Sequence, residues 1–259
     1  MPNFIPALPA QTADRSSAQR PRAVLFDAYG TLFDVYSVAQ LAEELFPGHG
    51  QALSVSWRDK QIEYTRLVTT CNHGAHYRPF SALTRAALVY AIKKIVICQA
   101  NTWATGQIDQ NFQENYGLQV QRLLDHYQQL NAFPENLAVL QELKARGIPT
   151  GILSNGDEAM LEAAVHSAGF DGLLDHILSV DPIRKFKTHP QAYALGEQAT
   201  GLAACDIVFV SSNAWDALGA TWYGYQTLWV NRYHLPFEEL GTQPARTGHD
   251  LRAVLDFFC

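Results

Sequence analysis

The chain has 259 residues, enough for one large domain or for a core domain that carries a smaller second one. It is 47% hydrophobic and 17% charged, as globular proteins are, and its formal net charge of −6 argues against a nucleic-acid surface, which needs clustered Lys and Arg. No apolar stretch reaches the roughly 18–20 residues of a membrane-spanning helix.

The first 21 residues are rich in Pro, Ala, Ser and Gln, with neither a basic start nor a continuous apolar core. We therefore expect a flexible tail over residues 1–21 and no signal peptide. The four cysteines form no CxxC pair; they are Cys71, Cys98, Cys205 and Cys259. Free thiols in a reducing compartment, and hence a cytoplasmic protein, are expected.

The first predicted element is a buried strand over 23–27, "AVLFD", which ends in a carboxylate. Its continuous apolar character is typical of a strand whose two faces are both covered by helices. The terminal Asp27 can cap a helix, bind a metal, transfer a proton or act as a nucleophile, and the strand alone leaves all four open.

The interval 35–127 is much longer than one crossover helix requires and is predicted to be mostly helical. The helical patterns cover 37–46, 52–70, 80–96 and 111–127. A helical insertion after the first strand would lie over the carboxyl ends of the strands, where open α/β sheets bind ligands. We therefore predict a helical cap domain over residues 35–127.

Strands and helices alternate in the rest of the chain. Further strands are predicted over 149–156, 206–212 and 226–231, and helices over 134–146, 157–168, 190–200 and 214–222. This order predicts an α/β fold with a doubly wound, Rossmann-like parallel sheet, formed by residues 22–34 and 128–259.

Polar side chains follow several predicted strands where the topology brings the strand ends together. They are Asp27, then Ser154 and Asn155, then Ser211, Ser212, Asn213 and Asp216. Lys187 lies in the connection between the last two of these groups. Taken singly, "SNG" is also ordinary turn chemistry and Lys187 also fits a solvated surface. Their joint placement at one edge of the sheet favours an active site.

Five motifs, in order, resemble those of the haloacid dehalogenase superfamily, and more narrowly the type II L-2-haloacid dehalogenases. They are "FDAYGTLFDV", "WRDKQIEYT", "ILSNG", "SVDPIRKFK" with Tyr193 following, and "FVSSNAWD". The resemblance extends from about residue 22 to the C-terminus and is weakest around 70–80 and 92–118. It implies a hydrolase of carbon–halide bonds that converts short L-2-haloalkanoates, haloacetates included, to 2-hydroxy acids with inversion.

Two departures from the phosphatases of that superfamily support this interpretation. Phosphatases usually carry a second aspartate two positions after the nucleophile, where this chain has Tyr29. A halide leaves as a weak base and needs no general acid. The motif "SSNAWD" supplies only Asp216 where phosphatases use several carboxylates to hold Mg²⁺, so we expect no metal and no other cofactor.

By resemblance, Asp27 is the nucleophile that forms an ester with the substrate. Lys187 would keep its carboxylate ionised, and Thr31 would orient it. Arg58 would face the departing halide, with Asn155 as an amide donor beside it. Without the resemblance, Arg58 also reads as an ordinary solvated helix arginine.

The remaining candidates concern the second step and substrate binding. Asp216 is expected to activate water, helped by Asn213 and Ser211. The substrate contacts are assigned to Ser154 with backbone N–H groups near Gly30, to Tyr193, to Ala28 beside the nucleophile, and to an apolar pocket of Tyr29, Ile62, Phe80 and Trp215. Each aromatic side chain also fits plain core packing.

Two other functions stay open at this point. One is a Mg²⁺-dependent phosphatase of the same superfamily, and the other is a non-catalytic relative that binds a ligand in the cleft. His73 and His76 lack further ligands at matching spacing and read as surface residues. The expected partner is a small 2-haloacid, with no nucleic acid and no membrane, and the resemblance makes a homodimer plausible.

Overall fold

The computed structural model describes residues 20–97 and 112–259. Within these ranges six strands form one parallel sheet in the order β3-β2-β1-β4-β5-β6. The strands are β1 (Ala23–Phe26), β2 (Thr150–Ser154), β3 (His176–Ser179), β4 (Ile207–Ser211), β5 (Gln226–Val230) and β6 (Arg246–Gly248). Strand β1 lies in the middle, between β2 and β4, and every residue of these three strands is buried. The predicted α/β class with a doubly wound parallel sheet is confirmed.

The two outer strands were not predicted, since the sequence analysis placed strands only at 23–27, 149–156, 206–212 and 226–231. Strand β3 ("HILS") has only its last residue buried, and no residue of β6 ("RTG") is buried. Short edge strands need less apolar surface than central ones. Their sequences therefore lack the continuous apolar run by which the central strands were recognised.

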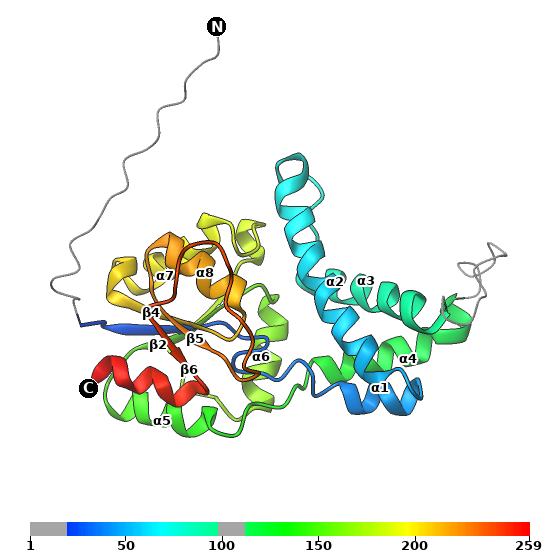
Figure 1. The fold of residues 1–259 in the computed structure, drawn as a ribbon, viewed down its shortest axis with the longest axis horizontal. Helices are drawn as coiled ribbons and strands as arrows, with labels where there is room; N and C mark the ends of the chain where they lie inside the picture. The colour runs from blue at the N-terminus through cyan, green and yellow to red at the C-terminus, as the bar shows by residue number, and fades with distance from the viewer. Residues whose placement is uncertain (1–19, 98–111) are drawn as a thin grey trace, which may run out of the picture.

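Helices cover both faces of the sheet. They are α5 (Asn136–Ala145), α6 (Glu158–Ser167), α7 (Pro190–Thr200) and α8 (Ala214–Tyr223), with short 3-10 helices at Asp181–Ile183, Ala204–Asp206 and Leu251–Phe258. Figure 1 shows α7 and α8 on one face, and α5 with the C-terminal 3-10 helix on the other. The predicted helices 134–146, 157–168, 190–200 and 214–222 agree with α5 to α8 to within two residues at each end.

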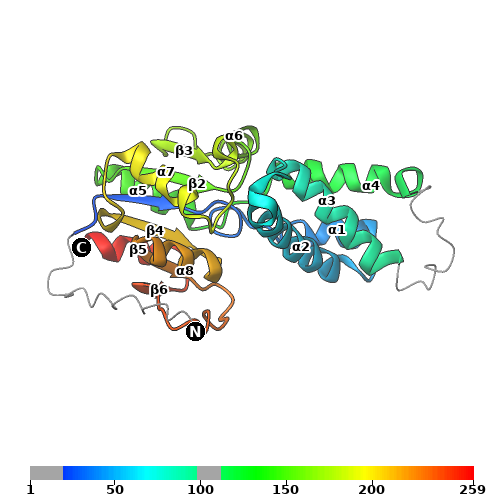
Figure 2. The ribbon, with the colours of Figure 1, turned by 90° about the horizontal axis from the view of Figure 1, so that it is seen from above.

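The helices that follow β1 form a separate lobe. They are α1 (Ala39–Leu45), α2 (Gly50–Thr70), α3 (Phe80–Ile92), a π-helix at Lys93–Ile97 and α4 (Phe112–Tyr127), with a 3-10 turn at Cys71–Gly74. Figures 1 and 2 show this lobe beside the sheet, next to the end toward which β1 points. The helical insertion was predicted, whereas the domain boundaries 22–34, 35–127 and 128–259 stay a proposal. The tail prediction falls almost wholly outside the described residues.

Two further predictions concern the surface. Cys71, Cys205 and Cys259 are free and exposed, and Cys98 lies outside the described residues. His73 and His76 are exposed as well. Across residues 20–97 and 112–259, no helix combines the length and the apolar character needed to cross a bilayer.

Candidate active site

Asp27 lies directly after β1, at the carboxyl end of the central strand. Its backbone N–H still donates to the carbonyl of Val210 at 2.8 Å, which holds the residue in line with the sheet. The chain then turns sharply at Gly30, whose φ is +95°, and the carbonyl of Ala28 accepts from the N–H of Leu32 at 2.9 Å. Glycine allows this conformation at little cost. The turn presents the Asp27 carboxylate at the edge of the sheet where the strands end, and 6% of the residue's surface is exposed.

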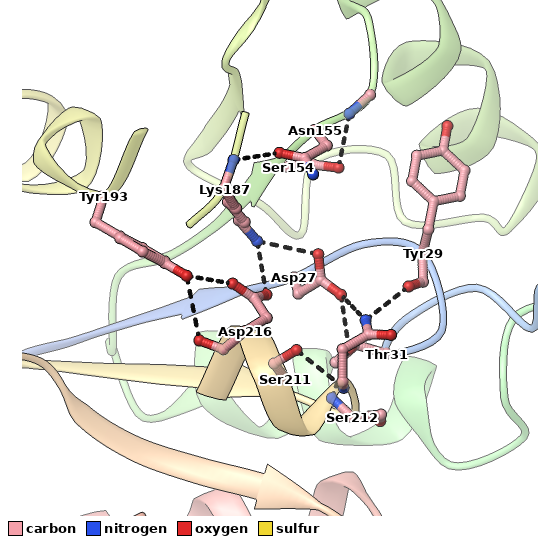
Figure 3. A network of polar contacts seen from close by, with 12 residues as sticks. Asp27, Tyr29, Thr31, Ser154, Asn155, Lys187, Tyr193, Ser211, Ser212 and Asp216 are labelled. Carbon is pink, nitrogen blue, oxygen red and sulfur yellow. Dashed lines mark hydrogen bonds and ion pairs between the residues drawn. The ribbon is translucent and has the colours of Figure 1, made fainter. Parts of the chain in front are cut away.

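Three side chains hold the Asp27 carboxylate from different parts of the chain (Figure 3). Lys187 Nζ lies 3.0 Å from Oδ1, while Thr31 Oγ1 and Asn213 Nδ2 donate to Oδ2 at 3.1 and 2.8 Å. These donors fix the orientation of the carboxylate and stabilise its charged form.

The side chain of Lys187 is completely buried and lies between two carboxylates. Its Nζ is 2.9 Å from Oδ2 of Asp216, in addition to its contact with Asp27, and 4.7 Å from the centre of the Phe209 ring. Burial opposes the charge on the ammonium, but the carboxylates of Asp216 and Asp27 outweigh it and raise the pKa of Lys187 above its ordinary value. Lys187 is therefore a cation at neutral pH.

Asp216 lies in the first turn of α8 and is also fully buried. Its Oδ1 accepts from the Tyr193 hydroxyl at 2.8 Å, and its Oδ2 faces Lys187. Burial raises the pKa of Asp216 to about 6; Lys187 opposes this rise and Asp27 adds to it. The carboxylate is ionised at pH 7 and becomes protonated in mild acid.

Arg58, from helix α2 of the helical lobe, reaches the turn that follows Asp27. Its Nη2 donates to the carbonyl of Tyr29 at 2.9 Å and to Oδ1 of Asn213 at 3.2 Å. Only 9% of the residue is exposed, and it forms no ion pair with any described residue. A buried cation without a carboxylate partner is suited to receive an anion.

Asp27 and Arg58 line one small cavity, whose empty space, including the part open to solvent, is about 280 Å³. It is lined by Asp27, Tyr29, Arg58, Ile62, Thr65, Phe80, Ser154, Asn155 and Trp215. The rings of Tyr29 and Phe80 pack against each other with centres 5.5 Å apart. The cavity therefore combines aromatic and aliphatic walls with neutral polar side chains, and its charged groups are one carboxylate and one guanidinium.

The structure brings together most residues that the sequence singled out. Every lining residue except Thr65 was predicted, and Thr31, Lys187 and Asn213 contact Asp27 directly. The roles assigned to these residues stay proposals.

Other predicted site residues do not line the cavity but contact residues near Asp27. Tyr193 and Ser211 were predicted to bind substrate or assist water, yet neither lines the cavity. Tyr193 donates to Asp216, and Ser211 Oγ accepts from the N–H of Asn213 at 3.1 Å. Ala28 is fully buried and also lies outside the lining. Asp216 and Asn213, which Tyr193 and Ser211 contact, do not line the cavity either.

The sequence analysis missed Thr65, although a signal was present. Arg58, Ile62 and Thr65 stand at positions i, i+4 and i+7 of α2, so they share one face of the helix. Extending the Arg58 face by one more turn would have found it.

Carboxylates such as the two of this site are possible ligands of a metal ion. The Asp27 and Asp216 carboxylates are both paired with Lys187, and within the part of the chain that the structure describes no group of three or more His, Cys, Asp or Glu side chains could hold a metal ion.

Comparison with known proteins identifies relatives that cover most of the chain. A family model described as haloacid dehalogenase-like hydrolase matches residues 21–224. Haloacetate dehalogenase H-2 of Moraxella sp. (strain B) is 40% identical over 234 residues, which cover 90% of this chain and 96% of that protein. The (S)-2-haloacid dehalogenase of Pseudomonas sp. (strain YL) is 41% identical over 238 residues, 92% of this chain and 94% of that protein.

Solved structures show the same similarity in three dimensions. The crystal structure of an L-2-haloacid dehalogenase is 51% identical, with a TM-score of 0.81, and the match covers 92% of this chain and 99% of that one. The L-2-haloacid dehalogenase of Xanthobacter autotrophicus with chloropropionic acid covalently bound is 30% identical, with a TM-score of 0.76, over 92% of this chain and 98% of that one.

Proposed function

The chain belongs to the haloacid dehalogenase-like hydrolases, and on this premise we propose that it hydrolyses short L-2-haloalkanoic acids, haloacetates included, to 2-hydroxy acids with inversion at C2. The family resemblance indicated by the motifs is confirmed. One observation carries the proposal furthest: Asp27 and Arg58, a carboxylate and a buried cation without an ion-pair partner among the described residues, line the same small cavity. A nucleophile and a receptor for the leaving anion are the two groups that displacement of a halide requires.

In the first step an Asp27 oxygen attacks C2. A new C–O bond forms as the carbon–halogen bond breaks, and the halide leaves with the electron pair toward Arg58, with the amide NH₂ of Asn155 beside it. The Oδ1 of Asn155 accepts from the N–H of Lys187 at 2.9 Å, which orients the NH₂ away from that contact. Preorganised donors of this kind are each worth about 3–4 kcal/mol of barrier.

The substrate carboxylate is a substituent of the reacting carbon, so the groups that bind it must lie beside the line from Asp27 to the departing halide. Ser154 is fully buried at the end of β2 and lines the cavity, and its Oγ accepts from the N–H of Gly156 at 3.1 Å. Its hydroxyl proton can therefore be donated to the substrate carboxylate. The N–H groups of Gly30 and Thr31 already donate to carbonyls within the turn, so the backbone donors for the substrate must come from residues before Gly30.

In the second step water attacks the carbonyl carbon of the Asp27 ester. Asp216 takes a proton from the water, and the bond between the Asp27 carbonyl carbon and the oxygen that attacked C2 breaks. That oxygen leaves with the hydroxy acid and receives the proton, while the restored Asp27 carboxylate keeps the water oxygen and the second water proton is released. Asp216 is the proposed base that orients this water, and Lys187, which contacts both carboxylates, stabilises the charge that develops on the ester oxygen. Water is a poor nucleophile at saturated carbon, so the ester route divides a difficult reaction into two easier ones.

A halide-release panel tests the proposal. We expect purified protein to release chloride from L-2-chloropropionate and from chloroacetate in the presence of EDTA, and to leave D-2-chloropropionate unchanged. Asp27→Asn abolishes release, while Asp34→Asn, a matched change in the same loop, retains it. Hydrolysis of small phosphate esters with Mg²⁺, without halide release, would contradict the proposal and support the phosphatase alternative. Binding of haloacids without any turnover would support the ligand-binding alternative.

Three properties beyond the chemistry complete the proposal. We propose that the protein acts in the cytoplasm, because its cysteines form no CxxC pair and those in the described residues are free. We propose a homodimer by analogy with the family. The net charge of −6 gives no support for a nucleic-acid partner.

A further inference from the structure

Gln61 is a buried amide that lies one helical turn after Arg58 on α2. Only 1% of the residue is exposed, and it does not line the cavity. Its Oε1 accepts from Arg58 Nη1 at 2.8 Å and from the hydroxyl of Tyr127, on α4, at 3.3 Å. Its Nε2 donates to Thr84 Oγ1, on α3, at 2.6 Å. One side chain therefore connects the guanidinium on α2 to two further helices of the lobe, α3 and α4.

The hydrogen-bond partners determine which end of the amide faces Arg58. Thr84 Oγ1 donates to the carbonyl of Phe80 at 2.8 Å, so it accepts from Gln61. Burial raises the pKa of Tyr127, whose hydroxyl stays protonated and donates to Gln61. Reversing the amide would place its NH₂ against the donors of Arg58. Oε1 is consequently held against the guanidinium.

The acceptors around Arg58 are all neutral. They are Oε1 of Gln61, the carbonyl of Tyr29 and Oδ1 of Asn213, and the neutral Tyr127 hydroxyl also interacts with the guanidinium. A glutamate at position 61 would reach the same Nη1 and form an i,i+3 ion pair with Arg58, and its charge would cancel the positive potential at the cavity. An amide supplies the hydrogen bond and leaves the positive charge available to an anion.

We propose that Gln61 is a positioning residue for the leaving-group step: its Oε1 fixes the Arg58 guanidinium beside the cavity without neutralising it. This inference rests on the proposed dehalogenation. In that step the Asp27 oxygen–C2 bond forms, the carbon–halogen bond breaks and the electron pair departs with the halide. Negative charge therefore develops on the halide, which Arg58 stabilises, and no proton is transferred. Gln61 acts through Arg58 alone and has no part in the breakdown of the ester.

Leaving-group dependence separates this role from a merely structural one. Chloride is the poorer leaving group and needs more stabilisation than bromide, so weakening Arg58 slows chloride release more. For Gln61→Glu we expect single-turnover chloride release from L-2-chloropropionate to fall about 100-fold, the loss typical of a misplaced or weakened catalytic group. Bromide release from L-2-bromopropionate falls less, and the rate of Asp27 ester breakdown, followed by mass spectrometry, stays unchanged. Gln51→Glu, the same charge change at an exposed position of α2, leaves all three rates unchanged.

Thr84→Val is the second variant, since it keeps the side-chain shape and removes the acceptor that holds Nε2 of Gln61. We expect a smaller rise in the bromide-to-chloride rate ratio, and this variant decides the matter if Gln61→Glu does not fold. If chloride and bromide release slow equally, so that the ratio of the two rates is unchanged, the inference is overturned. The same holds if ester breakdown slows by as much as halide release. Absence of halide release by the unaltered protein is a different result, because it rejects the proposed function itself.

Discussion

Lys187 Nζ lies 3.0 Å from Oδ1 of Asp27 and 2.9 Å from Oδ2 of Asp216, so one buried ammonium joins the two carboxylates of the proposed mechanism. The three residues come from the end of β1, the loop that precedes α7 and the first turn of α8. Without the cation, two like charges would share a buried site, and one of them would take up a proton. Lys187 therefore keeps the nucleophile and the base ionised together.

Replacing Lys187 with methionine keeps the length of the side chain and removes its charge. We expect Lys187→Met to lose about 3–5 kcal/mol of unfolding free energy, the usual effect of breaking a buried ion pair, and to abolish halide release. Urea denaturation and a halide assay measure the two effects. The control is Lys185→Met, a part-exposed lysine two residues earlier, which should change stability by no more than about 0.5 kcal/mol. A Lys187→Met protein as stable as the unaltered one would refute the pairing.

The second prediction concerns pH. Burial raises the pKa of Asp216 to about 6, above the value of about 3.9 in an unfolded chain. The folded state thus binds more protons between these values, so this contribution to stability is fully present below about pH 4 and is lost as the pH rises through about 6. Activity changes in the opposite sense, because only the ionised carboxylate can orient water.

Ester breakdown should accordingly slow about tenfold per pH unit below about pH 6. Rapid-mixing measurements of the ester between about pH 5 and 8 would reveal this acidic limb. Asp216→Asn should give slow breakdown with no such limb, whereas Asp171→Asn, at an exposed site, should keep the normal profile. An acidic limb that persists in Asp216→Asn would assign the titration to another group.

Asp157 connects the core to the helical lobe. Its carboxylate accepts from the backbone N–H of Phe80 at 2.6 Å and of Ser81 at 3.1 Å, at the start of α3. We expect Asp157→Ala to cost about 1–2 kcal/mol, as the loss of a helix cap does, and to raise KM, because Phe80 lines the cavity. Asp157→Asn keeps one acceptor and should have a smaller effect on both. Thermal unfolding and steady-state kinetics measure these changes, and an unaltered KM in Asp157→Ala would contradict the link to the cavity.

Gly30 gives the fourth prediction. Its φ of +95° is rare for residues with a Cβ, although a Cβ would lie 3.5 Å from Nδ2 of Asn213, an ordinary contact. The backbone conformation is therefore the obstacle, and Gly30→Ala should lose about 1–3 kcal/mol and most of the activity. Gly48→Ala introduces similar strain at φ +80° in open space, so it should lose stability but keep activity. Equal retention of activity in both variants would show that the turn at Gly30 is not needed to shape the site.

The sequence predicted the central sheet because β1, β2 and β4 are buried throughout and hence continuously apolar. The edge strands β3 and β6 carry no such pattern, since their side chains are partly or fully exposed. The periodicity of α2 and α3 likewise predicted most of the helical lobe. Local patterns thus identify elements with a buried face and miss those that pair only at an edge.

For the site, motifs predicted which residues gather but not how they are connected. Lys187 was expected beside Asp27, yet its equal approach to Asp216 depends on the path of the loop between β3 and α7, which no local pattern encodes. Tyr193 was expected near substrate and instead supports Asp216. Gln61 was not singled out as a site residue, because its contacts with Tyr127 and Thr84 arise from the packing of α2 against α4 and α3.

The central claim is that Asp27 itself attacks carbon, and a single turnover in ¹⁸O-labelled water tests it most directly. With enzyme in excess over L-2-chloropropionate, the product should contain only unlabelled oxygen at C2, and mass spectrometry of the peptide that contains Asp27 should find one ¹⁸O in its carboxylate. Label in the hydroxyl group of the first-turnover product, with Asp27 unlabelled, would mean that water attacks the substrate directly and would contradict the account.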